Sequence, residues 1–429
     1  MKPSLESERK LVRAVGLKEI IALTINGIIG AGIFAIPATI GKTLGMSSPI
    51  AFVIAGFFCA NIVLCFAELG GRYDRTGGAY LYAHEAFGEL TAFLIGWMYF
   101  LARLTSTAAL SNTLAGFLSY FMDVDILLRS TVIVTLLLLL GLINYSGIRS
   151  SSRVINFLTI AKLVPLLIFI VGGLSLVEWK AFAQAPFPPA KPLSEALLLA
   201  MFAFSGFEVI AIPGAEMINP KRNLPLGILI GTAVTIVVYL LIQVVAVATH
   251  PGLADSLSPL AEAAERFLGK KGGTLLTVGA FCSTLGTLTS LLLVGPRILY
   301  AMALNRQMPE IFSRVHERFR TPHVAILFTT VLGIVIALSG TFTTLATLSA
   351  MARLMTYIGA AVALWVLRRR QASPDTFRAP GGFVIPLLTV LLSLFLLSAA
   401  TLTHWISGSL ALLVGLLLYL AGATSKFRR

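Results

Sequence analysis

Charged side chains are scarce in this sequence. Lys, Arg, Asp and Glu make up 12% of its 429 residues, and 57% of the residues are hydrophobic. Soluble globular domains carry about 25% charged residues, so this composition excludes a soluble protein. Apolar runs of about 20 residues, the length that crosses a bilayer as a helix, recur along the whole chain. The sequence therefore predicts an all-α polytopic membrane protein, integral to a lipid bilayer.

Residues that carry chemistry are also few. The three cysteines lie in apolar segments without the spacing of a metal site or a disulfide framework. Gly41-Lys42-Thr43 resembles the tail of a phosphate-binding loop, but Ile36 stands where that motif needs its first glycine. We therefore expect no enzyme, no metal and no cofactor. The sequence shows no polar pore or filter of the kind that a channel needs. The first 17 residues are polar, which does not fit a cleavable signal peptide.

Twelve apolar segments are predicted to span the membrane. They lie near residues 18–41, 48–71, 87–119, 126–146, 154–176, 193–217, 225–249, 272–303, 322–340, 342–367, 382–402 and 404–424. With both termini in the cytoplasm, the inner segments hold 22 of the 33 Lys and Arg residues and the outer loops hold seven, as the positive-inside rule requires. The net charge of +14 then faces anionic lipid and not nucleic acid. We expect the protein in a bacterial inner membrane.

The first span is interrupted. Gly27, Gly30 and Gly32 fall within six residues, and Pro37 follows. Glycine weakens a helix and proline removes an amide donor. In hydrocarbon such a break is tolerated where protein, water or a ligand satisfies the freed backbone groups. Amides at the start of the second half-helix can hold an anion such as a carboxylate. Close packing through small residues is the alternative interpretation.

The sixth span repeats this interruption, with Ser205-Gly206, the acid Glu208 and the pair Pro213-Gly214. Broken helices at matching positions of two inverted halves indicate the central binding site of a secondary transporter. The predicted division is a cytoplasmic tail (1–17), a first repeat (18–176), an inverted second repeat (193–367), two peripheral spans (382–424) and a second cytoplasmic tail (425–429).

Four charged side chains fall inside predicted spans, where a charge is costly: Arg103, Lys162, Glu208 and Arg353. The arginines are either partners in structural ion pairs or residues of a transport pathway. Lys162 lies about two helical turns inside the membrane, where desolvation disfavours the charged form of a lysine. It is a candidate proton-binding switch, or a fixed positive charge in place of a metal cation, with a passive salt bridge as the alternative.

In combination these motifs resemble the amino acid–polyamine–organocation (APC) transporter family. The resemblance rests on Gly27–Pro37, Glu68–Gly78 with Gly96-Trp97, Phe202–Glu216 with Asn219–Pro225, and the stretch from Arg353 to Gly382. It implies the fold of the sodium-coupled leucine transporter, with a five-plus-five inverted repeat of ten core helices and two peripheral ones. The peripheral pair is expected to serve as scaffold or as the contact of a homodimer.

The resemblance also implies the substrate contacts. The α-carboxylate of an amino acid would bind the amides of Ala31 and Gly32, and its α-ammonium group the carbonyls of Ile28, Phe202 and Ser205. Phe202 would also close the outer side. The other predicted contacts flank these residues or face them from the third and eighth spans: Gly30, Ala203, Gly206, Thr107 and Leu291, beside Ser283 and Thr287.

Leu291 and Thr107 decide the predicted substrate, because the arginine/agmatine antiporters carry tryptophan and asparagine at these positions. Without an aromatic cage for a cation beyond Phe202, we predict neutral, small-to-medium L-amino acids. Glu208 can instead favour a cationic amino acid or a polyamine, and Arg103 an acidic one, unless the two residues pair with each other.

Lys162 falls on a position where some proton-coupled relatives carry a lysine in place of a sodium ion. This implies a sodium-independent carrier, coupled to protons or exchanging substrates, in which protonation of Lys162 or Glu208 biases opening. Sodium-coupled symport is disfavoured by the same lysine. A different class of function, an amino acid sensor or partner subunit that does not transport, is disfavoured by the intact pair of breaks and by the lack of a signalling domain.

Overall fold

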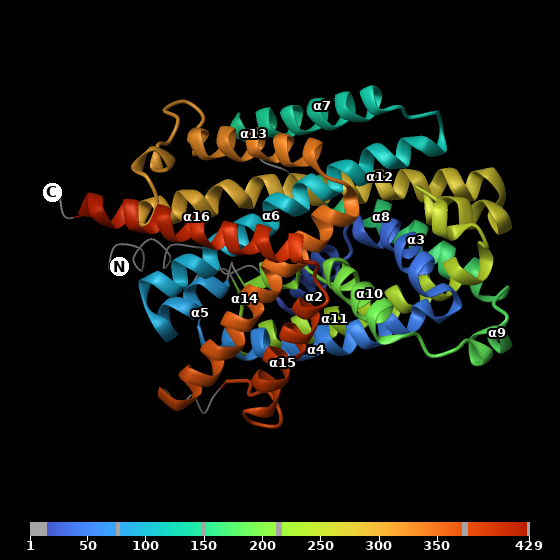
Figure 1. The fold of residues 1–429 in the computed structure, drawn as a ribbon, viewed down its shortest axis with the longest axis horizontal. Coiled ribbons are helices and arrows are strands. Elements are labelled where there is room, and N and C mark those ends of the chain that lie inside the picture. The colour runs from blue at the N-terminus through green and yellow to red at the C-terminus, as the bar shows by residue number, and fades with distance from the viewer. Residues whose placement is uncertain (1–14, 74–77, 147–151, 212–216, 371–375, 427–429) are drawn as a thin grey trace.

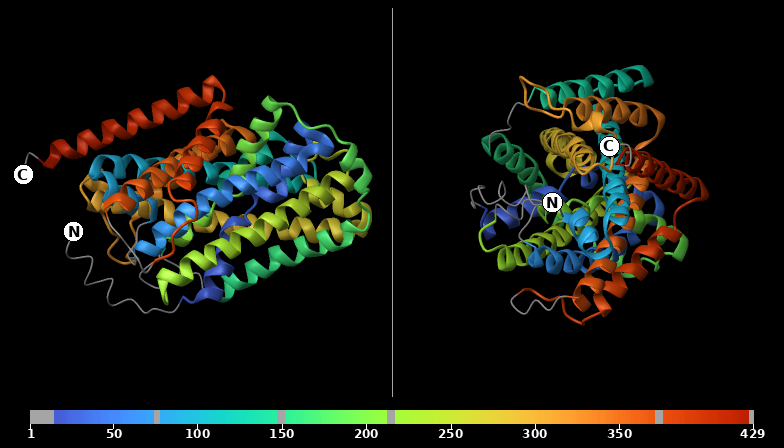
Figure 2. Two further views of the ribbon diagram at one scale, coloured as in Figure 1. Left: turned by 90° about the horizontal axis from the view of Figure 1, so that it is seen from below. Right: turned by 90° about the vertical axis from the view of Figure 1, so that its left-hand side faces the viewer.

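The computed structural model describes residues 15–73, 78–146, 152–211, 217–370 and 376–426 (Figure 1). Within these ranges every regular element is a helix, apart from one isolated bridge between Val15 and Met217. Most of the longer helices run side by side along the long axis of the molecule (Figures 1 and 2). The prediction of an all-α protein is confirmed. Most of the two predicted tails, and the pair Pro213-Gly214, lie outside the described residues.

The first half of the chain opens with a broken helix, because Ile29–Ala31 separate α2 from α3. Its helices are α2 Leu17–Ile28, α3 Gly32–Leu44, α4 Ser48–Arg72, α5 Gly78–Phe87, α6 Glu89–Phe117, α7 Ile126–Tyr145, α8 Ser152–Leu174 and α9 Trp179–Gln184.

The second half also opens with a break, between α10 and the short 3-10 helix η3. The elements are α10 Ala190–Ala203, η3 Phe207–Ala211, α11 Pro220–Thr249, α12 Pro259–Leu304, α13 His323–Ser339, α14 Phe342–Arg370, α15 Val384–Ser398 and α16 Leu402–Lys426.

Helices occupy the predicted spans, with differences at three places. A separate helix, α5, forms in and beyond the predicted cytoplasmic connector, and α9 forms within a predicted outer loop. The helix α12 begins 13 residues before the predicted eighth span (Pro259 against 272) and kinks at Gly269, where φ is +66°. Glycine adopts this left-handed conformation without steric cost, so a helical pattern in the sequence did not reveal the kink.

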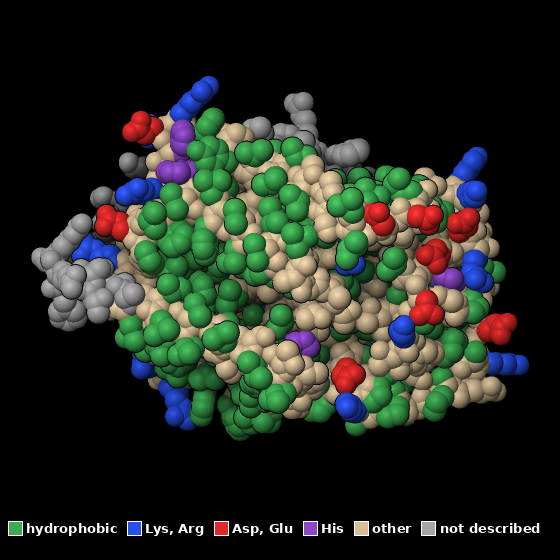
Figure 3. Space-filling view, turned by 45° about the horizontal axis from the view of Figure 1, so that its top comes forward, with side chains coloured by type: hydrophobic (Ala, Val, Ile, Leu, Met, Phe, Trp, Pro, Cys, Tyr) green, Lys and Arg blue, Asp and Glu red, His purple; other side chains and the backbone are tan. Residues whose placement is uncertain are grey.

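The surface is that of a membrane protein. Among the described residues, eight helical segments are long and apolar enough to cross a bilayer, and three shorter apolar helices accompany them. Hydrophobic side chains cover the middle of the molecule, and most charged side chains gather toward its two ends (Figure 3). The chain is therefore an integral membrane protein.

The broken helices lie at the centre of the bundle. The half-helix α2 packs against α11, and α3 packs against α10, while α4, α11 and α12 contact α3 and α14 contacts α10. The two halves of each broken helix thus meet in the interior, where the exposed backbone of each break faces protein or an internal space and not lipid. This position makes the two breaks the natural place to look for a binding site.

Candidate functional site

The break in the first helix leaves backbone amides without acceptors. The helix α2 ends at Ile28, whose carbonyl accepts a hydrogen bond from the amide of Gly30 (2.7 Å). The helix α3 then starts at Gly32. In this part of the described chain, no backbone acceptor faces the amides of Ala31, Gly32 and Ile33. Free amides at a helix N-terminus carry a partial positive charge, so this break can hold an anion.

The break in the sixth predicted span touches the first break directly. Residues 204–206 separate α10 from η3, and Gly206 has a φ of +121°. A Cβ atom at Gly206 would lie 2.2 Å from the carbonyl oxygen of Gly27. Only glycine allows this approach, so the two breaks lie in contact, backbone against backbone.

Tyr239 of α11 connects the two breaks. The single proton of its fully buried hydroxyl is shared between the carbonyls of Ile28 (2.8 Å) and Ala203 (3.3 Å), the last residues of α2 and α10. The sequence analysis missed this residue. The available signal was a tyrosine in the interior of an otherwise apolar span, since a buried phenol needs a hydrogen-bond partner.

Replacing Tyr239 with phenylalanine should weaken substrate binding about tenfold, because about 1 kcal/mol per lost hydrogen bond would no longer hold the two breaks in register. Binding titrations of the purified variant would measure the effect. Tyr419→Phe on α16, whose ring packs on Phe93, is the control and should bind as the wild type does. Unchanged binding by Tyr239→Phe would contradict a role in positioning the breaks.

Lys162 reaches the first break from α8. Its ammonium group donates to the carbonyls of Asn26 (2.7 Å) and Ile29, and only 4% of the residue is exposed. No carboxylate in the described chain forms an ion pair with it. The alternative of a passive salt bridge thus finds no partner among the described residues. A cation that binds two carbonyls at the end of α2 satisfies the acceptors that the break exposes.

A cavity of about 640 Å³ lies between the two breaks. Its size suits a small molecule. The predicted site residues that line it come from α2, α3, α6, α8, α10, α12 and α14 and from the breaks: Ile28, Gly30, Ala31, Gly32, Arg103, Lys162, Phe202, Ala203, Ser205, Gly206, Leu291 and Arg353, with Ser283 and Thr287 beside them.

Thr107 does not line this cavity, which corrects one sequence prediction. The lining face of α6 runs through Arg103, Ser106 and Leu110. Thr107 donates its hydroxyl to the carbonyl of Arg103 (3.0 Å), and its methyl group faces Gly333 of α13. Because successive helical residues are about 100° apart, Ser106 and Leu110 lie on one side of Arg103 around the axis of α6, and Thr107 lies on the other.

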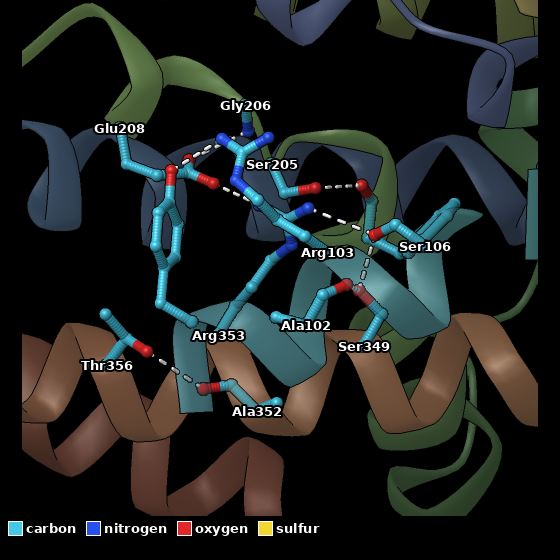
Figure 4. A network of polar contacts seen from close by, with 12 residues as sticks. Ala102, Arg103, Ser106, Ser205, Gly206, Glu208, Ser349, Ala352, Arg353 and Thr356 are labelled. Atoms are coloured by element: carbon cyan, nitrogen blue, oxygen red, sulfur yellow. Dashed lines mark hydrogen bonds and ion pairs between the residues drawn. The ribbon is translucent and has the colours of Figure 1, made fainter. Parts of the chain in front are cut away.

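Glu208 is turned away from the cavity and pairs with Arg353. Its carboxylate also accepts hydrogen bonds from the amide of Gly206 (2.8 Å) and the hydroxyl of Tyr357 (3.3 Å). The predicted alternative that Glu208 pairs with Arg103 is therefore wrong. Both members of the actual pair are buried, so the ion pair joins η3 to α14 in the interior (Figure 4).

The Arg353 side chain is also tied to α6. It donates to Ser106 (3.0 Å), and Ser106 shares a hydrogen bond with Ser349 (2.7 Å). Ser349 in turn donates to the carbonyl of Ala102 (2.8 Å). This chain of polar contacts connects α6, α14 and the second break (Figure 4). A movement of η3 would therefore strain or displace the polar contacts of both α6 and α14.

The cavity extends from the breaks toward one end of the molecule. On that side it is lined by Leu23 and Asn26 of α2, Asn144 near the end of α7, and Arg297 of α12. On the opposite side Phe202 packs edge-to-face on Phe342 of α14, with ring centres 6.0 Å apart. The aromatic pair therefore lies at the end of the cavity opposite to Arg297.

The sequence is similar over most of its length to known transport proteins. Residues 15–420 match the family described as amino acid permease. The methylthioribose transporter of Bacillus subtilis (strain 168) is 28% identical, over 96% of this chain and 93% of that protein. The serine/threonine exchanger SteT of the same organism is 29% identical, over 95% of each chain. Cationic amino acid transporter 4 of Mus musculus is 30% identical, over 88% of this chain and 63% of that protein.

Proposed function

Because the chain belongs to the amino acid permease family, we propose that it carries an amino acid across the membrane by alternating access, as a sodium-independent secondary transporter. Its relatives are named as transporters and permeases, so the chain is a transport protein and not an enzyme. The observation that carries the proposal is the cavity between two broken helices, with free amides on one of its walls.

The proposed architecture is the twelve-span, five-plus-five inverted repeat with cytoplasmic termini, in a bacterial inner membrane. Two broken helices, one opening each half of the chain, support the repeat. The peripheral helices α15 and α16 expose long apolar faces, which we assign to lipid or to the contact of a homodimer.

The proposed substrate pose places the α-carboxylate on the amides of Ala31 and Gly32. The α-ammonium group would bind the carbonyls of Ile28, Phe202 and Ser205. Ile28 and Phe202 already accept hydrogen bonds from Tyr239 and Ser205, but a carbonyl oxygen has two lone pairs and can accept a second bond. All these groups line the cavity.

The walls of the cavity favour a substrate without a positively charged side chain. Among the described residues that line it, Arg103, Lys162, Arg297 and Arg353 are charged, and none is Asp or Glu. A cationic side chain would meet only like charges there. We therefore propose neutral, small-to-medium amino acids, packed on Phe202 and Leu291, over the cationic or polyamine alternative, although one relative is named for cationic substrates.

Flux into proteoliposomes tests the proposed function. Uptake of a radiolabelled neutral amino acid that persists when choline replaces sodium is the expected result. Uptake only in sodium would show a sodium symporter. Binding without any flux, in either direction and with counter-substrate inside, would show a sensor or partner subunit and overturn transport.

Lys162 is the proposed coupling residue, because its ammonium binds carbonyls at the end of α2 and no carboxylate among the described residues pairs with it. We expect Lys162→Ala to lower uptake driven by a proton gradient at least tenfold while substrate exchange persists, as proton transfer is the step that the variant removes. Flux at a series of external pH values measures this. Lys180→Ala on α9 is the control, and an unchanged pH dependence in Lys162→Ala would exclude the role.

A further inference from the structure

Arg103 is a buried cation that has no acidic partner among the described residues. It is 3% exposed and lines the cavity from α6. Its guanidinium donates to the hydroxyl of Tyr99 (2.6 Å) and lies over the ring of the same residue, 4.8 Å from its centre. Its Nε atom is buried and has no acceptor, and no carboxylate in the described chain forms an ion pair with it.

The other cations of the cavity are accounted for. Glu208 neutralises Arg353, and Arg297 is exposed at the mouth of the cavity. Lys162 binds two carbonyls, and a buried lysine can release its proton, whereas arginine stays charged in proteins. Among the described residues that line the cavity, Arg103 is therefore the buried, permanent charge without a counterion. Leaving such a charge buried is costly unless an anion reaches it.

The Arg103 guanidinium lies beside the second break. Figure 4 shows its side chain extending from α6 toward Ser205 and Gly206, residues that line the same cavity. The free amides of Ala31 and Gly32 belong to the first break, which lines the same cavity. The cavity thus presents two separate groups of anion-binding donors, and its volume of about 640 Å³ exceeds what one carboxylate fills.

We propose that Arg103 forms a second anion subsite, which binds the side-chain carboxylate of an acidic amino acid while the first break binds its α-carboxylate. Acidic amino acids would then bind more tightly than neutral ones of the same size. The inference rests on the proposed transport function and changes its preferred substrate: neutral amino acids still enter the cavity, but acidic ones of the same size bind more tightly. The bidentate fork of a guanidinium suits a carboxylate, and the substrate would supply the negative charge that the cavity wall lacks.

Two pairs of nearly isosteric ligands test the subsite in the wild-type protein. Binding titrations should give affinities for aspartate and glutamate at least about tenfold higher than for asparagine and glutamine, because a charge-assisted hydrogen bond replaces a neutral one. Equal affinities, or tighter binding of the amides, would overturn the subsite. This comparison needs no variant, so it stands even if a change at Arg103 impairs folding.

A pair of variants assigns the effect to one arginine. Arg103→Gln should reduce the preference for aspartate over asparagine to within about twofold. Arg297→Gln removes the same charge at the mouth of the same cavity and should leave the ratio of the two affinities as in the wild type. If both variants change the ratio equally, the preference comes from the general positive potential of the cavity, and the subsite is excluded.

A free anion is the other source of the same chemistry. If chloride occupied Arg103, binding of a neutral amino acid would weaken when gluconate replaces chloride, and aspartate would show no advantage over asparagine. That result would overturn the assignment to the substrate. Binding of neutral amino acids alone would remove the acidic subsite and leave the proposed transport function standing, whereas binding of no amino acid would contradict both.

Discussion

Replacing Gly206 with alanine is expected to abolish substrate binding and transport. The new Cβ atom would lie 2.2 Å from the carbonyl oxygen of Gly27, and residue 206 has a φ of +121°. Both obstacles are in the backbone, so no rotamer change relieves them. Strain of this kind costs about 1–3 kcal/mol before the clash is counted. We therefore expect the two breaks to separate, with the loss of the cavity between them.

Thermal unfolding and binding titrations of the purified protein measure this effect. Gly116→Ala is the matched control, because a Cβ at Gly116 of α6 would meet no atom within 4 Å. Alanine in a helix is favoured over glycine by about 1 kcal/mol, so this variant should be as stable as the wild type or more so. Wild-type binding by Gly206→Ala would show that the two backbones need not touch for the site to form.

Removing the charge of Glu208 is expected to be the second severe change. Glu208→Gln keeps the shape of the side chain but leaves Arg353 as a buried charge without its counterion. Breaking a buried ion pair in this way costs about 3–5 kcal/mol. The expected result is a large fall in the midpoint of thermal unfolding, together with a loss of transport.

The double variant Glu208→Gln/Arg353→Met distinguishes the cost of an uncompensated charge from the other effects of changing Glu208. If the cost lies in the uncompensated charge, removing both charges should recover most of the stability. Asp255→Asn is the control for a charge pair at the surface, because Lys42 and Asp255 lie 3.0 Å apart with 65% and 84% of their side chains exposed. It should cost about 1 kcal/mol or less. A similar small cost for Glu208→Gln would contradict a structural role for the buried pair.

The sequence predicted the positions of the helices and of both breaks because membrane helices must satisfy their own backbone. Glycine clusters in apolar runs therefore carry a clear signal, and the structure places chain interruptions at Gly30 and Gly206. The kink at Gly269 gave no comparable signal, since one glycine near the start of a helix fits many conformations.

Pairing of charges could not be predicted in the same way. Glu208 had two arginines within reach of the centre of the bundle, and the choice of Arg353 over Arg103 depends on how α6 and α14 are rotated about their axes. The same rotation placed Ser106 and not Thr107 on the cavity wall. Hydrophobic periodicity sets such rotations weakly when a helix is buried on nearly every side, as α6 is.

The contacts between α2 and η3 determine which parts of the molecule can move together. Besides the approach of Gly27 to Gly206, the amide of Ile218 donates to the carbonyl of Val15 (2.9 Å), and α2 packs along η3. The Gly27–Gly206 approach and the Val15–Ile218 hydrogen bond lie at opposite ends of α2, so we expect α2 and η3 to move as one body. Because Glu208 of η3 pairs with Arg353, such a movement would draw α14 with it and would couple the cavity to both halves of the chain.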